Sequence, residues 1–228
     1  HDFLASTAVF LPGGERLITI AGDDTLRLWD VRHGTEIWNV RGTGRRGLLA
    51  LSPDGTQIVT GRDEGKVTQV WDTQTGEQLR ILETGRLEEL IRQYPKADRA
   101  ELQKQLPDVT AIDFSPDGRL IATGDSAGMC WLWPLAESEP RQNFRAHDHA
   151  ITALQWLNEG QVLVTASADG SIAFWDVASG KEMAGRRLRH ADAVSLLDVS
   201  ADGTAALSVA ADGRGGQHLY HWDLANRQ

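Results

Sequence analysis

The sequence predicts an all-β fold made of five repeats of one four-stranded unit. Two marks recur along its 228 residues. One is a turn motif, written "LPGG", "SPDG", "SPDG", "LNEG" and "SADG" at residues 11–14, 52–55, 115–118, 157–160 and 200–203. The other is a tryptophan, at positions 29, 71, 133, 175 and 222. The tryptophans are 42, 62, 42 and 47 residues apart, so one insertion of about 20 residues and one of about four leave a period near 42.

Each repeat has the pattern of four short strands. The first strand precedes the turn motif and the second follows it, as at 109–115 and 119–125. The third strand ends in the tryptophan, and the fourth follows a glycine-containing turn, as in "TEIWNV" at 35–40. Alternation rich in Val, Ile, Leu and Thr between Pro, Asp and Gly turns is typical of half-buried strands. Four such strands in about 42 residues, repeated, indicate a blade of a β-propeller.

These units resemble the WD-repeat (WD40) β-propellers, over the whole chain except residues 83–107. The resemblance implies one propeller domain over residues 1–228, with four-stranded blades and a helical insertion at 83–107. Because the family usually closes seven blades into a ring, the five repeats are expected to be part of a larger propeller whose remainder lies in flanking sequence. A ring of five blades is the alternative.

The resemblance also implies a hydrogen-bonded ladder in each blade: a His in the entering loop, a Ser or Thr on the second strand, an Asp in the next turn and the Trp. The ladders would use His1, Thr19, Asp23 and Trp29; His147, Thr165, Asp169 and Trp175; and His190, Ser208, Asp212 and Trp222. In the second repeat, Gly42 and Glu64 stand in place of the His and the Asp. In the third repeat, Gln105 and Ala127 stand in those places, so only Thr123 and Trp133 of the ladder are retained. We therefore expect repeats two and three to be the least stable.

The net charge of −9 is interpreted as the result of acidic residues that shape turns. Twenty of the 32 acidic residues are Asp, and ten of these Asp, with two Glu, recur at the same turn positions of the repeat. Asp favours turns because its carboxylate accepts hydrogen bonds from nearby backbone N–H groups. The balance argues against nucleic acid as a partner, since that requires a basic face.

Two further features bear on the compartment. No apolar run approaches the roughly 18 residues of a membrane helix, so no membrane contact is expected. Cys130 is the only cysteine, which rules out an internal disulfide and favours a reducing, cytoplasmic setting.

The insertion at 83–107, "ETGRLEELIRQYPKADRAELQKQLP", has a helical pattern. Leu87, Leu90, Ile91 and Tyr94 fall on one helix face, and the next residue is a proline. Asp98 and a Glu three residues later look like a capping box that opens a second short helix. The apolar stripe would either fold down on the propeller or form a hairpin that binds a partner.

The insertion also indicates a candidate binding face. In the resembled family, the loops between blades and the turns between second and third strands open on one face, and binding residues concentrate on such loops. Arg and aromatic side chains are frequent interface anchors. The candidate partner-binding residues on this face, beside Asp148 and Asp192, are Phe3, Arg45, Arg46, Arg62, Tyr94, His149 and Arg214.

No catalytic pattern is present. "GTGRRG" at 42–47 lacks the Lys-Ser/Thr ending of a phosphate loop, and "HDH" at 147–149 has no accompanying ligand set. We expect no metal and no cofactor. The sequence therefore predicts a non-enzymatic scaffold that binds other proteins or peptides. The alternatives are a sensor or regulatory module fused to an effector such as a kinase, a protease or a nucleotide-driven switch, and a propeller enzyme.

Overall fold

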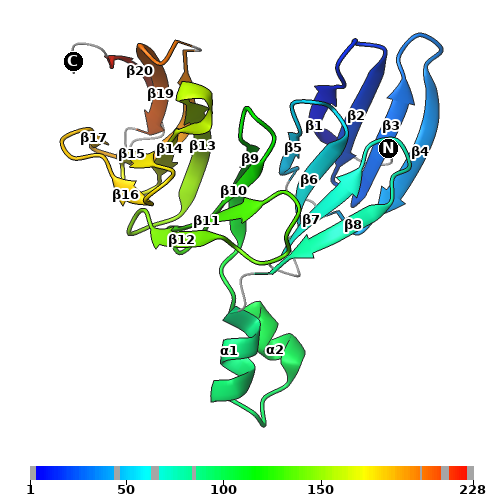
Figure 1. Cartoon of the computed structure of the whole chain (residues 1–228), viewed down its shortest axis with the longest axis horizontal. Helices are drawn as coiled ribbons and strands as arrows, with labels where there is room; N and C mark the ends of the chain where they lie inside the picture. Colours follow the sequence, from blue (N-terminus) through cyan, green and yellow to red (C-terminus); the bar gives the residue numbers. More distant parts are fainter. Residues whose placement is uncertain are drawn as a thin grey trace.

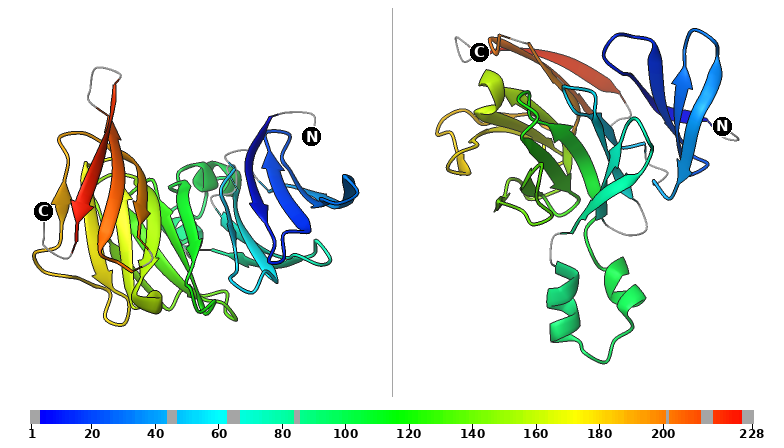
Figure 2. Two further views of the ribbon diagram at one scale, coloured as in Figure 1. Left: turned by 90° about the horizontal axis from the view of Figure 1, so that it is seen from above. Right: turned by 45° about the vertical axis from the view of Figure 1, so that its right-hand side comes forward.

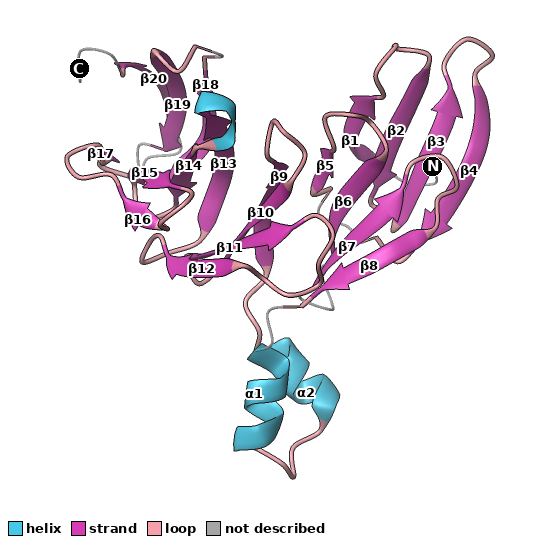
Figure 3. Ribbon diagram, viewed as in Figure 1, coloured by secondary structure: helices cyan, strands magenta, loops and turns pink. Residues whose placement is uncertain are grey.

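The described chain forms five antiparallel sheets, here called blades 1 to 5, which follow one another along an open arc (Figures 1 and 2). The computed structural model describes residues 4–43, 47–62, 67–83, 86–200, 202–211 and 216–224. Within each blade the strands pair mainly in chain order, and the remaining described residues lie in turns, loops, a helical hairpin and one short 3-10 turn (Figure 3). The expected all-β propeller fold is confirmed, whereas membership of a larger ring stays a prediction.

The strands have the following bounds. Blade 1 contains β1 (Ala5–Phe10), β2 (Arg16–Ala21), β3 (Thr25–Asp30) and β4 (Thr35–Arg41). Blade 2 contains β5 (Leu49–Leu51), β6 (Gln57–Arg62), β7 (Val67–Asp72) and β8 (Gln78–Leu82). Blade 3 contains β9 (Val109–Phe114), β10 (Leu120–Asp125), β11 (Met129–Pro134) and β12 (Gln142–Arg145). Blade 4 contains β13 (Ile151–Leu157), β14 (Val162–Ser167), β15 (Ser171–Asp176), β16 (Lys181–Glu182) and β17 (Leu188–Arg189), with a 3-10 turn at Asn158–Gly160. Blade 5 contains β18 (Val194–Val199), β19 (Ala205–Ala211) and β20 (Gln217–Asp223).

The blades are held together by apolar side chains between their faces. Trp71 of blade 2 packs with Ile18 and Leu28 of blade 1, and all three are buried. Trp133 and Trp175 contact the preceding blade in the same way. The repeated tryptophan is thus a large filler between neighbouring sheets, and its truncation to Ala in such a core costs about 3–5 kcal/mol.

The "SPDG" turn has a repeated internal structure. Asp54 accepts hydrogen bonds from the Ser52 hydroxyl at 2.6 Å and from the Thr56 backbone N–H at 3.0 Å. The same two bonds occur in the turns that begin at residues 115 and 200. Gly55 has a φ of +72°, and a Cβ there would overlap the ring of Pro12 in the blade 1 turn. The motif therefore closes each first hairpin and lets adjacent turns touch.

A helical hairpin separates blades 2 and 3. It consists of α1 (Arg86–Gln93) and α2 (Arg99–Lys104), inserted between β8 and β9, and it projects away from the arc (Figures 1 and 2). The Asp98 carboxylate caps α2 by accepting hydrogen bonds from the N–H groups of residues 100 and 101.

The apolar side chains of the hairpin form a cluster of their own. Leu87, Leu102 and Leu106 are buried there, with Leu90 and Ile91 packed against them. The cluster is separate from those between the blades, so the stripe of α1 packs mainly against α2 instead of folding down on the propeller. This happens because α2 offers an apolar side at close range. The hairpin is a compact projection with a small core.

Candidate interaction surface

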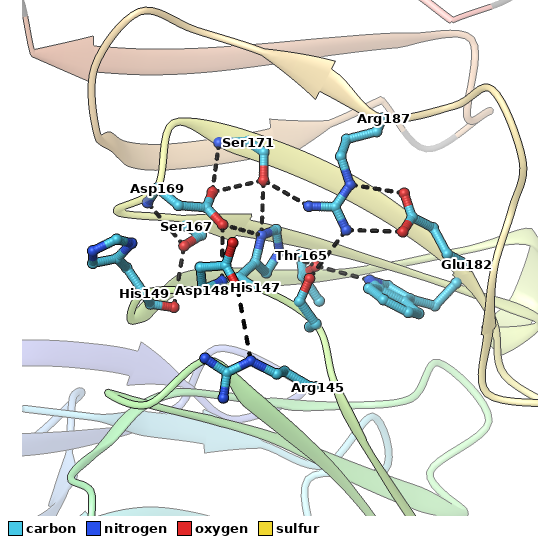
Figure 4. Close-up of polar contacts among 12 residues, drawn as sticks. Arg145, His147, Asp148, His149, Thr165, Ser167, Asp169, Ser171, Glu182 and Arg187 are labelled. Atoms are coloured by element: carbon cyan, nitrogen blue, oxygen red, sulfur yellow. Dashed lines mark hydrogen bonds and ion pairs between the residues drawn. The ribbon is translucent and has the colours of Figure 1, made fainter.

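The ladder of blade 4 joins its four expected residues. The Trp175 indole Nε1 donates to Thr165 Oγ1 at 2.9 Å, and that hydroxyl lies 2.6 Å from His147 Nε2 (Figure 4). His147 Nδ1 lies 3.3 Å from Asp169 Oδ2 and 2.9 Å from Ser171 Oγ. Because a carboxylate only accepts, the network places the ring proton on Nδ1 and leaves Nε2 to accept from the threonine hydroxyl.

The charges of this ladder follow from burial and hydrogen bonding. Burial lowers the pKa of His147, although the neighbouring Asp169 carboxylate acts in the opposite direction, so the ring is neutral at pH 7. Burial alone would raise the pKa of Asp169. Hydrogen bonds donated by Ser171 and by the Asp148 backbone N–H outweigh that effect and hold the pKa at about 2. The ladder is therefore a neutral imidazole beside a charged carboxylate.

The tryptophan bond recurs in every blade. The indole Nε1 donates to a second-strand hydroxyl in the pairs Trp29–Thr19 at 2.8 Å, Trp71–Thr60 at 2.9 Å, Trp133–Thr123 at 3.0 Å, Trp175–Thr165 at 2.9 Å and Trp222–Ser208 at 2.7 Å. In blade 5, His190 Nε2 lies 2.9 Å from the Ser208 hydroxyl. Asp23 of blade 1 accepts from Thr25 and pairs with Arg27 at 3.3 Å. His1 and Asp212 lie outside the described residues.

Blade 3 uses a different acid, which the sequence analysis missed. Asp125 is 5% exposed and accepts hydrogen bonds from the backbone N–H groups of Ala127 and Met129, each at 2.9 Å. The Trp131 indole lies 3.5 Å from its other oxygen. The acid stands two residues before the Ala127 position where the repeat pattern places it. A search that allowed that offset would have found it.

Arg187 is a second residue that the sequence analysis missed. Its guanidinium donates to both oxygens of Glu182, at 2.8 and 2.9 Å, to Ser171 Oγ at 2.9 Å and to the Ala146 carbonyl at 3.1 Å (Figure 4). The side-chain hydrogen bonds with Glu182 raise the pKa of Arg187 and lower the pKa of Glu182. Arg187 thus ties the outer strand of blade 4 to the ladder and to the preceding loop. Nothing in the sequence distinguishes it from its arginine neighbours.

The loops between blades lie at the same ends of the sheets as the hairpin (Figure 1). Tyr94, just after α1, is 48% exposed, and His149, in the loop between blades 3 and 4, is also exposed. Asp148 beside it forms a long ion pair of 3.8 Å with Arg145. Arg62 is the last residue of β6, and its side chain is not among those that the structure describes. The other candidates lie outside the described residues: Phe3, Arg45, Arg46 and Arg214.

Within the described residues, no group of three or more His, Cys, Asp or Glu side chains could hold a metal ion. Cys130 is fully buried, and burial raises the pKa of its thiol far above the usual range. None of the described helices has the length and apolar character needed to span a membrane.

The comparison with known families is decisive for the fold. A β-propeller family model, described as "Nucleolar protein 10-like, N-terminal domain", matches residues 38–212, more than half of the chain. The chain belongs to the WD-repeat β-propeller family. The recurrent ladders and turns described above are therefore those of WD-repeat blades.

Three curated relatives illustrate the similarity of this WD-repeat chain. The "Guanine nucleotide-binding protein subunit beta" of Oryza sativa subsp. indica is 31% identical over 67% of the chain and 38% of that protein. The human "Angio-associated migratory cell protein" is 28% identical over 89% of the chain and 45% of that protein. The "Protein LST8 homolog" of Drosophila melanogaster is 24% identical over 73% of the chain and 49% of that protein. The WD-repeat chain spans less than half the length of each. WD-repeat relatives are in general protein-interaction scaffolds.

Proposed function

We propose that this WD-repeat chain is a non-enzymatic protein–protein interaction scaffold that binds partners with the face carrying the loops between blades. The observation that carries this proposal is the α1–α2 hairpin. It projects from that face, and its apolar side chains form a cluster separate from those of the blades. A projection of this kind adds little to the packing of the blades, so its surface is available for a partner.

The loops around the hairpin are held in place by the blades. Gly128 lies directly under the backbone carbonyls of His147 and His149, so close that a Cβ would overlap them. Gly170 repeats this arrangement: a Cβ there would lie 3.0 Å from the carbonyls of His190 and Asp192. Each hairpin turn therefore supports the next inter-blade loop. Loops held in one conformation lose little entropy when a partner binds.

The hairpin surface has an exposed aromatic side chain and mixed charges. Tyr94 is its exposed aromatic residue, and Glu88 pairs with Arg99 at 3.2 Å while Glu101 pairs with Lys104 at 2.7 Å. Because these exposed pairs balance one another, net charge does not select the partner. An exposed aromatic side chain on a projecting element is the kind of group that anchors an interface.

The test is a pull-down with three variants of the full chain. The first replaces residues 86–104 by a short Gly/Ser linker, the second is Tyr94→Ala, and the third is the control Ile37→Ala, at a 46% exposed site on β4 of blade 1. Bound proteins are identified by mass spectrometry, and thermal unfolding checks that the blades remain folded. We expect the same partner to be lost with the first variant, weakened by the second and retained by the third. Identical capture by all variants would refute this assignment of the surface.

A further inference from the structure

A second surface lies at the outer rim between blades 4 and 5. There a pocket of about 170 Å³ is lined on the blade 4 side by Phe174, Arg186, Arg187 and Leu188, and on the blade 5 side by Asp223 and Leu224. Drug-sized ligands occupy pockets of about 300–1,000 Å³. This pocket has room for a single large side chain.

The pocket exists because the outer strand of blade 4 is broken. At the junction of blades 1 and 2, the outer-strand residue Trp38 covers the next blade: its Nε1 donates to the Thr73 carbonyl at 3.1 Å, and its ring contacts the Gly76 turn. In blade 4, β16 ends at Glu182 and the chain turns outward before β17, with the Arg186 N–H bonded to the Met183 carbonyl at 3.2 Å. Met183 and Leu188 still pack against the core between blades 4 and 5, but no continuous outer strand covers this junction in the described part of the chain.

The broken strand is also a local basic patch. Residues 181–189 contain Lys181, Arg186, Arg187 and Arg189 against one acid, in a chain whose net charge is −9. That acid, Glu182, is already bound by Arg187 through two hydrogen bonds. Within the described part of the chain, the exposed side chain of Arg186 has no ion-pair or hydrogen-bond partner. Asp223, across the pocket, already has an interaction partner.

We propose that this pocket binds a short acidic peptide segment of a partner protein. One large apolar side chain enters between Phe174, Leu188 and Leu224, and a carboxylate next to it in the peptide pairs with Arg186. The apolar lining accounts for affinity, and the unpaired guanidinium beside it selects for negative charge. The inference rests on the scaffold function proposed above but places a second binding surface on the rim, away from the hairpin.

The test uses three fluorescein-labelled octapeptides and fluorescence polarisation with the full chain. One peptide has acidic residues around a single central phenylalanine; the second has alanine in place of the phenylalanine; the third has lysines in place of the acids. We expect only the first to bind measurably. Arg186→Glu should weaken its binding by about tenfold or more, because it turns an attractive charge into a repulsive one. Arg189→Glu is the matched control, an exposed cation three residues further along the chain that does not line the pocket, and should change binding by less than about threefold.

Three results would overturn the proposal: no binding of the first peptide, equal binding of the lysine or alanine peptide, or equal weakening by Arg186→Glu and Arg189→Glu. The variant without residues 86–104 separates the two surfaces. If it binds the acidic peptide like the native chain but no longer captures its partner in the pull-down, both assignments stand. If the peptide fails to bind the native chain while hairpin-dependent capture persists, only the rim pocket is wrong.

Discussion

Replacing Asp113 by Asn should stabilise the protein at neutral and alkaline pH. Asp113 is half-buried in β9 and accepts a hydrogen bond from the Phe114 backbone N–H at 2.9 Å. Burial raises the pKa of this carboxyl to about 7 from an ordinary 3.8, although that hydrogen bond favours the charged form. Because the folded state holds its proton more tightly than the unfolded chain, the stability contributed by the protonated acid is full below pH 4 and is lost as the pH rises through 7.

The magnitude follows from the size of the shift. Each pKa unit corresponds to about 1.4 kcal/mol, so a rise from 3.8 to about 7 amounts to about 4 kcal/mol. The free energy of unfolding of D113N, minus that of the native chain, should therefore increase by about 4 kcal/mol between pH 4 and pH 8. Urea unfolding followed by tryptophan fluorescence at several pH values measures this difference.

A matched control exists in blade 5. Asp198 occupies the equivalent strand position and accepts the same bond from the next backbone N–H, at 3.0 Å, but it is exposed. Asp198→Asn thus reports the replacement of the charged acceptor of that hydrogen bond by a neutral amide oxygen, without the burial. The reasoning would be refuted if the difference in unfolding free energy between D113N and the native chain did not change with pH. It would also be refuted if this difference had the same pH dependence for both variants, because burial of the Asp113 carboxyl would then not control stability.

Three further outcomes are expected. Thr165→Val keeps the shape of the side chain but removes the hydroxyl shared by Trp175 and His147, and should destabilise the chain by about 1–3 kcal/mol in urea unfolding; no change would mean that the ladder is not stabilising. Gly170→Ala should destabilise more than Gly34→Ala, since both have positive φ but only Gly170 has neighbouring carbonyls within 4 Å; equal effects would mean that contact with the next loop is unimportant. In hydrogen exchange, the amides of α1 and α2 should exchange faster than those of the central strands, because the hairpin rests on a small core of its own; equal protection would contradict that independence.

Much of the blade architecture was predictable because it depends on neighbouring residues. The "SPDG" turn closes through bonds within five residues, and the strands follow from alternation along the chain. The pairing of Thr165 with Trp175 was reached through the WD-repeat resemblance, because in-register strands repeat the same geometry in every blade.

The features specific to this chain were not predictable in this way. Asp125 stands out of register with the repeat, and its role depends on the turn that its own carboxylate shapes. Arg187 finds Ala146, 41 residues away, only because the outer strand breaks after Glu182. The apolar stripe of α1 was compatible with packing against the blades or against α2, because hydrophobic periodicity shows that a helix face is buried but not which element covers it.

Local sequence patterns were sufficient to predict five repeated units, the positions of their tryptophans and the helical character of the insertion, and the WD-repeat resemblance added the hydroxyl partners. These features follow from the short-range alternation of apolar and polar residues and from turn residues that act on their immediate neighbours. The tertiary structure alone decided that the hairpin packs on itself and projects, that Asp113 is half-buried while its counterpart Asp198 is exposed, and that a pocket opens beside Arg186. Each of these depends on contacts between residues far apart in the chain, which packing creates and local pattern does not specify.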